Sequence, residues 1–164
     1  MHTTFLIAAI ATAGVALGYE ADLKIGPQNC FEPFSHKDVS ALAQQRLLEE
    51  ACKLAGMIGP DDKGIVAGGH LKREPWLDYR YVVTWIPGCT TVREKMDTRN
   101  PIPGDEVDCE ALLRGNYEKC NNGGVGGWID VGCLRYGFSI VDFPADWSEK
   151  NLKDEEKKIS GIWM

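Results

Sequence analysis

A helix, a glycine-rich turn and a strand follow one another in residues 105–142, DEVDCEALLRGNYEKCNNGGVGGWIDVGCLRYGFSIVD. Carboxylates at the start suit the positive end of a helix dipole, and the run from Asn121 to Gly124 is typical of a helix end and a turn. The helix carries one stripe, formed by Cys109, Leu112, Leu113, Asn116 and Cys120. We therefore predict a helix over 105–120 and a single long strand over 127–142, and this pair decides the fold class once the upstream elements are added.

Upstream of this stretch, hydrophobic periodicity and turn residues predict a strand over 20–25, a helix over 35–58, and strands over 65–67 and 79–86. Gly68-Gly69 predicts a bulge or an early stop after the second strand. The order strand, helix, strand, strand, helix, strand is that of the split β-α-β repeat. We therefore expect an α+β fold, a two-layer sandwich in which a four-stranded antiparallel sheet carries two helices on one face.

The N-terminus has the pattern of a secretory leader. Its apolar run from Phe5 to Leu17 has the length of a signal-peptide core and is too short to cross a membrane. We expect residues 1–18 to be removed, residues 19–145 to form one domain, and residues 146–164 to form a short helix or a tail. The product is expected to be secreted, extracellular and without a membrane association after cleavage.

All six cysteines lie in the part of the chain that follows the leader: Cys30, Cys52, Cys89, Cys109, Cys120 and Cys133. An even number of cysteines in an exported protein indicates a disulfide framework. No two of them have the spacing Cys-x-x-Cys, so we expect neither a metal site nor a cofactor. The cysteines are therefore interpreted as structural.

The spacing of the cysteines favours one disulfide over the others. Cys109 and Cys120 share a helix face but lie about 16 Å apart along the helix, too far to bond each other. The strand that returns after the helix is expected to bring Cys133 beside the helix start, which favours a Cys109–Cys133 bond. Three pairings remain open for the other four cysteines, and we favour Cys52–Cys120 with Cys30–Cys89.

The formal net charge of −6 argues against a nucleic-acid partner, because the chain as a whole would be repelled by phosphates. For catalysis, His70 with Arg73, Glu74 and Arg80 could supply the base, acid and anion-binding groups of a ribonuclease. A single histidine after a glycine-broken strand is, however, typical of a solvated residue. We therefore predict that the protein is not an enzyme. We also expect it to be a monomer.

Carboxylates are abundant, as a glycoside hydrolase would require: Asp61, Asp62, Asp105, Glu106, Asp108 and Glu110. The first two lie in a predicted turn and the others at a predicted helix start, so structural roles explain them. Lys72-Arg73 is either a dibasic processing site or a chance pair in a turn. The long connection over 89–104 has the length of a functional or mobile loop.

Aromatic residues occupy alternate positions of the predicted strands, so they are expected to share one face of the sheet. Trp128, Leu134, Tyr136 and Phe138 alternate with Ile129, Val131 and Cys133, and Tyr79, Tyr81 and Trp85 alternate in the same way in the strand over 79–86. If the helices cover the Cys133 face, the aromatic face is either covered by the C-terminal segment or open as a binding surface. No binding residue is assigned at this point.

Three short motifs give the second half of the chain a family resemblance: DCEALL at 108–113, YEKC at 117–120 and GCLRY at 132–136. Together with the glycine turn they resemble the cysteine-helix-cysteine and cysteine-strand signature of small exported fungal proteins over residues 105–140. The chain is similar there to killer-toxin-like modules and to LARS-type effectors, an avirulence and suppressor family.

The resemblance implies a protein released by a plant-associated fungus into the host apoplast. There it would bind a host plant protein and trigger or mask recognition by an immune receptor. It implies no catalytic residue. Two alternatives stay open, a killer-type toxin against competing microbes and a secreted ribonuclease or other hydrolase around His70.

Overall fold

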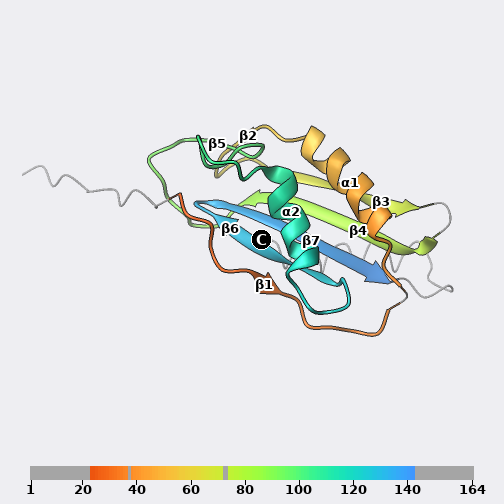
Figure 1. Ribbon diagram of the computed structural model, residues 1–164. Helices are drawn as coiled ribbons and strands as arrows, with labels where there is room; N and C mark the ends of the chain where they lie inside the picture. Colours follow the sequence, from red (N-terminus) through yellow and green to blue (C-terminus); the bar gives the residue numbers. More distant parts are fainter. Residues whose placement is uncertain (1–22, 37, 72–73, 143–164) are drawn as a thin grey trace, which may run out of the picture.

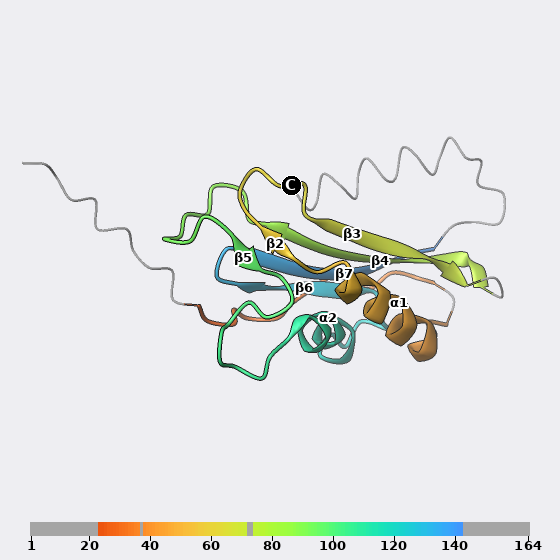
Figure 2. The ribbon, with the colours of Figure 1, turned by 90° about the horizontal axis from the view of Figure 1, so that it is seen from above.

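The computed structural model describes residues 23–36, 38–71 and 74–142, and the predicted α+β class is confirmed there (Figure 1). Its elements are β1 (Asn29–Cys30), α1 (Ala41–Lys53), β2 (Met57–Ile58), β3 (Ile65–Leu71), β4 (Glu74–Trp85), β5 (Met96–Asp97), α2 (Cys109–Glu118), β6 (Gly126–Val131) and β7 (Leu134–Asp142). Figure 2 shows α1 and α2 on the same side of the main sheet. The predicted leader, the Lys72-Arg73 pair and the C-terminal segment over 146–164 lie outside the described residues.

The main sheet has five strands in the order β1-β6-β7-β4-β3, and every neighbouring pair is antiparallel. The prediction of four strands is therefore wrong, because the stretch 127–142 forms two strands, β6 and β7. The first described strand lies at Asn29–Cys30, and residues 20–22 of the strand predicted over 20–25 lie outside the described residues. Within 23–25 only Ile25 makes a bridge, to Val131. A separate small sheet pairs β2 with β5.

A two-residue turn at Gly132 and Cys133 joins β6 to β7. Val131 pairs with Leu134 across this turn, and Gly132 has a φ of +56° while no described residue other than glycine has a positive φ. A glycine with positive φ at the first position of a two-residue loop is the arrangement of a type II′ hairpin turn. The single-strand prediction missed it because apolar, strand-forming residues flank the glycine on both sides.

The hairpin reverses the predicted alternation of faces. Val131 and Leu134 lie on the same face, so Ile129 and the alternate β7 residues that follow Leu134 lie there too. Cross-strand pairs such as Tyr81 with Phe138 extend this face across β4. All of these side chains are buried, and this is the face that the helices cover. Leu134, Tyr136 and Phe138 of the predicted aromatic face therefore lie beneath the helices, whereas Trp128 lies on the opposite face of the sheet. The condition that the helices cover the face of Ile129 and Val131 alone is wrong, because the hairpin puts these residues on the same face as Leu134.

Buried tyrosines attach the helices and loops to this face. The Tyr81 hydroxyl donates to the Gln44 carbonyl at 2.8 Å, and the Tyr136 hydroxyl donates to the Thr98 carbonyl at 2.9 Å. Burial raises the pKa of both hydroxyls well above the ordinary value of tyrosine. Both groups therefore remain protonated donors at any physiological pH.

Both helices are shorter than predicted because a cap residue fixes each start. The Ser40 hydroxyl accepts from the Ala43 amide at 3.2 Å, so α1 begins at Ala41 and not near Ser35. Asp108 caps α2 through the Ala111 amide at 2.9 Å. These oxygens satisfy amides that have no partner within the helix. In β3, the predicted irregularity is confirmed as a register shift between Gly69 and Leu71, and the strand continues beyond it.

All six cysteines form disulfides, as predicted, but all three predicted pairings are wrong. The bonds are Cys30–Cys120, Cys52–Cys109 and Cys89–Cys133. The favoured Cys109–Cys133 pair assumed that Cys133 lies within a strand that runs past the start of α2. Cys133 instead lies in the hairpin turn beside the end of β4, where its carbonyl accepts from the Ile86 amide at 2.8 Å.

We predict opposite stability effects for the same substitution at two glycines. Gly132→Ala should lower the free energy of unfolding by about 1–2 kcal/mol, because alanine is strained at positive φ. Gly115→Ala, within α2, should raise it by up to about 1 kcal/mol, because the added Cβ meets only the Lys119 side chain at 3.6 Å or more. Urea unfolding of the two variants measures both effects. Equal effects of the same sign would contradict the assigned turn.

Candidate functional site

The residues considered for ribonuclease chemistry do not form a described catalytic site. His70 is exposed at the end of β3, and the Arg80 guanidinium is within 2.6 Å of the Asp78 carboxylate. The side chains of Arg73 and Glu74 lie outside the described residues. No described partner therefore positions His70 as a general base.

Three of the carboxylates considered for glycoside hydrolysis, Asp62, Asp105 and Asp108, are engaged by backbone or basic groups. Asp62 accepts from the Gly59 amide at 2.8 Å and pairs with Lys95 at 3.2 Å, and these two contacts hold the pKa of Asp62 below its ordinary value. Asp105 accepts from the Val107 amide at 3.1 Å. With Asp108 acting as a helix cap, these carboxylates stabilise turns and a helix start.

Residues 23–36, 38–71 and 74–142 contain no cluster of three or more histidine, cysteine, aspartate or glutamate side chains suited to a metal ion. In the same ranges neither helix is both long and apolar enough to cross a bilayer. A cleft of about 520 Å³ lies beside the Cys52–Cys109 disulfide. Charged side chains of both signs line it, including Glu49, Lys53 and Arg99.

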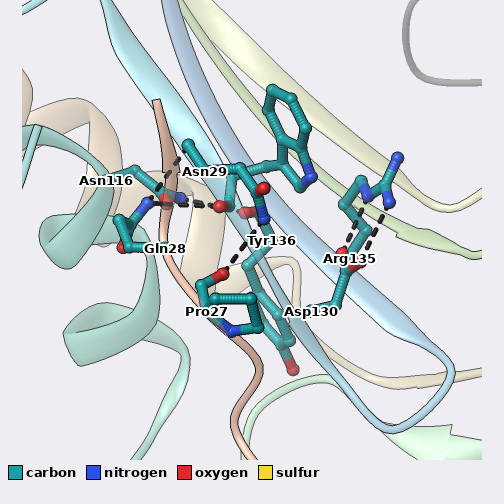
Figure 3. A network of polar contacts seen from close by, with 8 residues as sticks. Pro27, Gln28, Asn29, Asn116, Asp130, Arg135 and Tyr136 are labelled. Atoms are coloured by element: carbon teal, nitrogen blue, oxygen red, sulfur yellow. Dashed lines mark hydrogen bonds and ion pairs between the residues drawn. The ribbon is translucent and has the colours of Figure 1, made fainter. Parts of the chain in front are cut away.

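A buried amide network fixes the N-terminal segment to α2 and the sheet (Figure 3). The Gln28 amide nitrogen donates to Asn116 Oδ1 at 2.7 Å and to the Trp128 carbonyl at 3.2 Å. Asn116 is fully buried, and its Nδ2 donates to the Tyr136 carbonyl at 2.9 Å. One asparagine therefore connects α2 to β7 and to the segment that precedes β1.

A second amide holds the chain after α2 against the segment that follows β1. Asn122 Nδ2 donates to the Phe31 carbonyl at 2.9 Å and to the Gly126 carbonyl at 2.8 Å. The Phe31 amide donates in turn to the Gly126 carbonyl at 3.1 Å. Asn122, which the sequence indicated only as turn material, thus places Phe31 beside β6.

These networks position a cluster of side chains on the sheet face opposite the helices. Trp128, Asp130 and Arg135 alternate with the helix-facing residues of β6 and β7. The Arg135 guanidinium carbon is 5.5 Å from the centre of the Trp128 ring, and Phe31 packs against that ring at 5.3 Å between centroids. We call Phe31, Trp128, Asp130 and Arg135 the Trp128 surface. All four are partly exposed.

Asp130 holds Arg135 in place over the indole ring. Arg135 donates through Nε to Asp130 Oδ1 at 2.8 Å and through a terminal nitrogen to Oδ2 at 2.9 Å, as Figure 3 shows. This hydrogen bonding raises the pKa of Arg135 further above its already high ordinary value. The two-point contact fixes the plane of the guanidinium, so the cation is preorganised.

The sequence analysis placed Trp128 on one face with Leu134, Tyr136 and Phe138, which is wrong because the hairpin puts Trp128 on the opposite face. Its neighbours come from the segment after β1, from β6 and from β7, and their meeting depends on the hairpin at Gly132 and on the pairing of β1 with β6. The sequence did contain one indication of this ion pair. Asp130 and Arg135 lie on either side of Gly132, a spacing that is typical of an ion pair across a tight turn. Phe31 carried no comparable signal.

Comparisons of the chain with protein-family models, with curated proteins and with solved structures find no match.

We predict that Asn116→Ala lowers the free energy of unfolding by about 1–3 kcal/mol. The substitution removes the amide that bridges Gln28 and the Tyr136 carbonyl, and leaves polar groups poorly paired. Urea unfolding measures the effect, with Asn121→Ala as the control because Asn121 is exposed immediately beyond α2. Equal stabilities of the two variants would contradict the structural role of Asn116.

Proposed function

We propose that the protein is a secreted fungal effector that acts by binding a host plant protein or immune receptor, and not by catalysis. The Trp128 surface carries this proposal. It combines two aromatic rings and an arginine on the sheet face opposite the helices, and tryptophan and arginine contribute disproportionately to binding energy in protein interfaces.

Disulfides favour binding at this surface because they fix both of its edges. The Cys30–Cys120 bond anchors the residue before Phe31 to the chain just beyond α2. The Cys89–Cys133 bond anchors the turn that lies between Asp130 and Arg135. A preorganised surface loses less conformational entropy on association, so more of the contact energy appears as affinity.

The N-terminal segment that carries Phe31 also exposes apolar side chains. Ile25 is 40% exposed and Phe34 is 45% exposed, and both belong to the N-terminal segment that carries Phe31. A partner that contacts this segment and β6 together would bury aromatic and aliphatic area around a central arginine. Such a composition suits a protein partner better than a nucleic acid.

The proposals that the protein is exported and that it acts in a plant host rest on the sequence. Three disulfides are compatible with folding in an oxidising compartment. The predicted leader supplies a route to that compartment, and the resemblance of residues 105–140 to LARS-type effectors supplies the host. Among the carboxylates considered for catalysis, Asp62 and Asp105 stabilise turns, Asp62 also pairs with Lys95, and Asp108 caps a helix.

We predict that Trp128→Ala weakens the plant response to the purified, oxidised protein. Infiltration of a dose series into a panel of plant lines with different resistance genes should give a response in some lines only. Loss of a central aromatic contact of about 2 kcal/mol corresponds to a roughly thirtyfold higher dose for the same response.

Leu54→Ala is the matched control, because Leu54 is 61% exposed and lies at the C-terminal cap of α1, away from the Trp128 surface. Its dose dependence should equal that of the wild-type protein. Cleavage of RNA or glycans that is lost in His70→Ala would refute the binding proposal in favour of a hydrolase. Growth inhibition of yeast with no response in any plant line would favour a killer-type toxin.

A further inference from the structure

The sheet face opposite the helices contains a strip without large side chains. Trp128 of β6 pairs with Gly137 of β7, and Gly137 pairs with Val82 of β4, so these residues form one row across that face. The neighbouring row contains Gly126 of β6 and Ser139 of β7. We call Val82, Gly126, Gly137 and Ser139 the Gly137 strip. Figure 2 shows that both helices lie on the other side of the sheet.

The Gly137 strip is buried although neither helix covers it. Val82 is 4% exposed and Ser139 is 9% exposed, and both glycines are buried as well. Val66 pairs with Val82 in the same row, and at the edge of the sheet it is 59% exposed. Because glycine has no side chain that could shield a neighbour, the burial of Val82 beside Gly137 indicates that a further segment lies over the strip.

Two hydroxyl groups on this face give a second indication of a cover. Ser139 Oγ and Thr84 Oγ1 are buried, and neither has a hydrogen-bond partner within the described ranges. Thr84 pairs with Arg135 and therefore lies on the same face as the strip. On an open sheet face water would reach and satisfy both hydroxyls. Their burial thus points to a segment that lies over β4 and β7.

The C-terminal segment, residues 143–164, begins where such a cover is needed. It lies outside the described residues, and it follows β7, which has β6 on one side and β4 on the other. Nine residues form β7, so the strand is about 30 Å long. The 22 residues that follow would form a helix of about 33 Å, which is long enough to return along the whole strand.

The sequence of the C-terminal segment suits a cover with one apolar side. Leu152, Ile159 and Trp163 are separated by seven and four residues, a spacing that puts all three on one side of a helix. The residues between Leu152 and Ile159 are charged, and they carry both signs. This pattern is typical of a surface helix that buries one side against a sheet.

We propose that residues 143–164 dock on the sheet face opposite the helices and cover the Gly137 strip. Their apolar side excludes water from Val82, and the segment supplies the partners that the Ser139 and Thr84 hydroxyls lack. The docked segment borders the Trp128 surface, because Gly137 pairs with Trp128. The proposal does not depend on the effector function, since it concerns packing within one chain.

Nuclear Overhauser effects in the complete, oxidised protein labelled with ¹³C and ¹⁵N test the docking without any variant. Effects are expected between the methyl protons of Val82 and protons of residues 143–164. If the Val82 methyl groups show effects to residues 23–142 alone, the proposal is overturned. Effects between molecules, detected in a mixture of labelled and unlabelled protein, would assign the face to a second copy and would also overturn it.

Two double variants with the same change in charge form a matched pair. Leu152→Asp with Ile159→Asp places carboxylates on the apolar side of the segment, whereas Asn151→Asp with Ser160→Asp places them beside it. A soluble paramagnetic agent should relax the Val82 methyl protons about threefold faster or more in the first variant and at the wild-type rate in the second, because only the first opposes docking. An unchanged rate in the folded first variant, or equal acceleration in both, would refute the proposal.

Discussion

Chain reversal at Gly132 and Cys133 fixes which side chains of β6 and β7 face the helices. The pairing of Val131 with Leu134 puts the apolar residues of both strands on one face, where they are buried beneath α1 and α2. A strand that continued without the turn would send the residues after Leu134 to the opposite face, because the side-chain period of a strand is two. The core, the tyrosine hydrogen bonds and the Trp128 surface all depend on this register.

The parts of the fold that could be predicted are those encoded by local patterns. The apolar stripe before Cys52, the alternation over 79–86 and the even cysteine count indicated an α+β protein with two helices and disulfides. The hairpin could not be recognised because Gly132 lies in a run of strand-forming residues without a second turn former. The disulfide pairing was then wrong because it was derived from the missing turn.

The candidate site was less predictable than the fold because its members meet only through long-range pairing. Phe31 reaches Trp128 because β1 joins the edge of the sheet next to β6, and the isolated sequence of β1 is two residues long. Gln44 belongs to the buried side of α1, where an apolar residue is expected, and its burial becomes visible only when α2 and the sheet surround it. Both features arise from tertiary structure and not from a motif.

Disulfide mapping tests the position of the hairpin most directly, because the location of Cys133 decides its partner. Non-reducing proteolysis of the oxidised protein, followed by mass spectrometry, should release peptides that link Cys89 to Cys133 and Cys52 to Cys109. A peptide that links Cys109 to Cys133 would instead place Cys133 beside the start of α2, as in an uninterrupted strand. That result would contradict the register on which the core and the Trp128 surface depend.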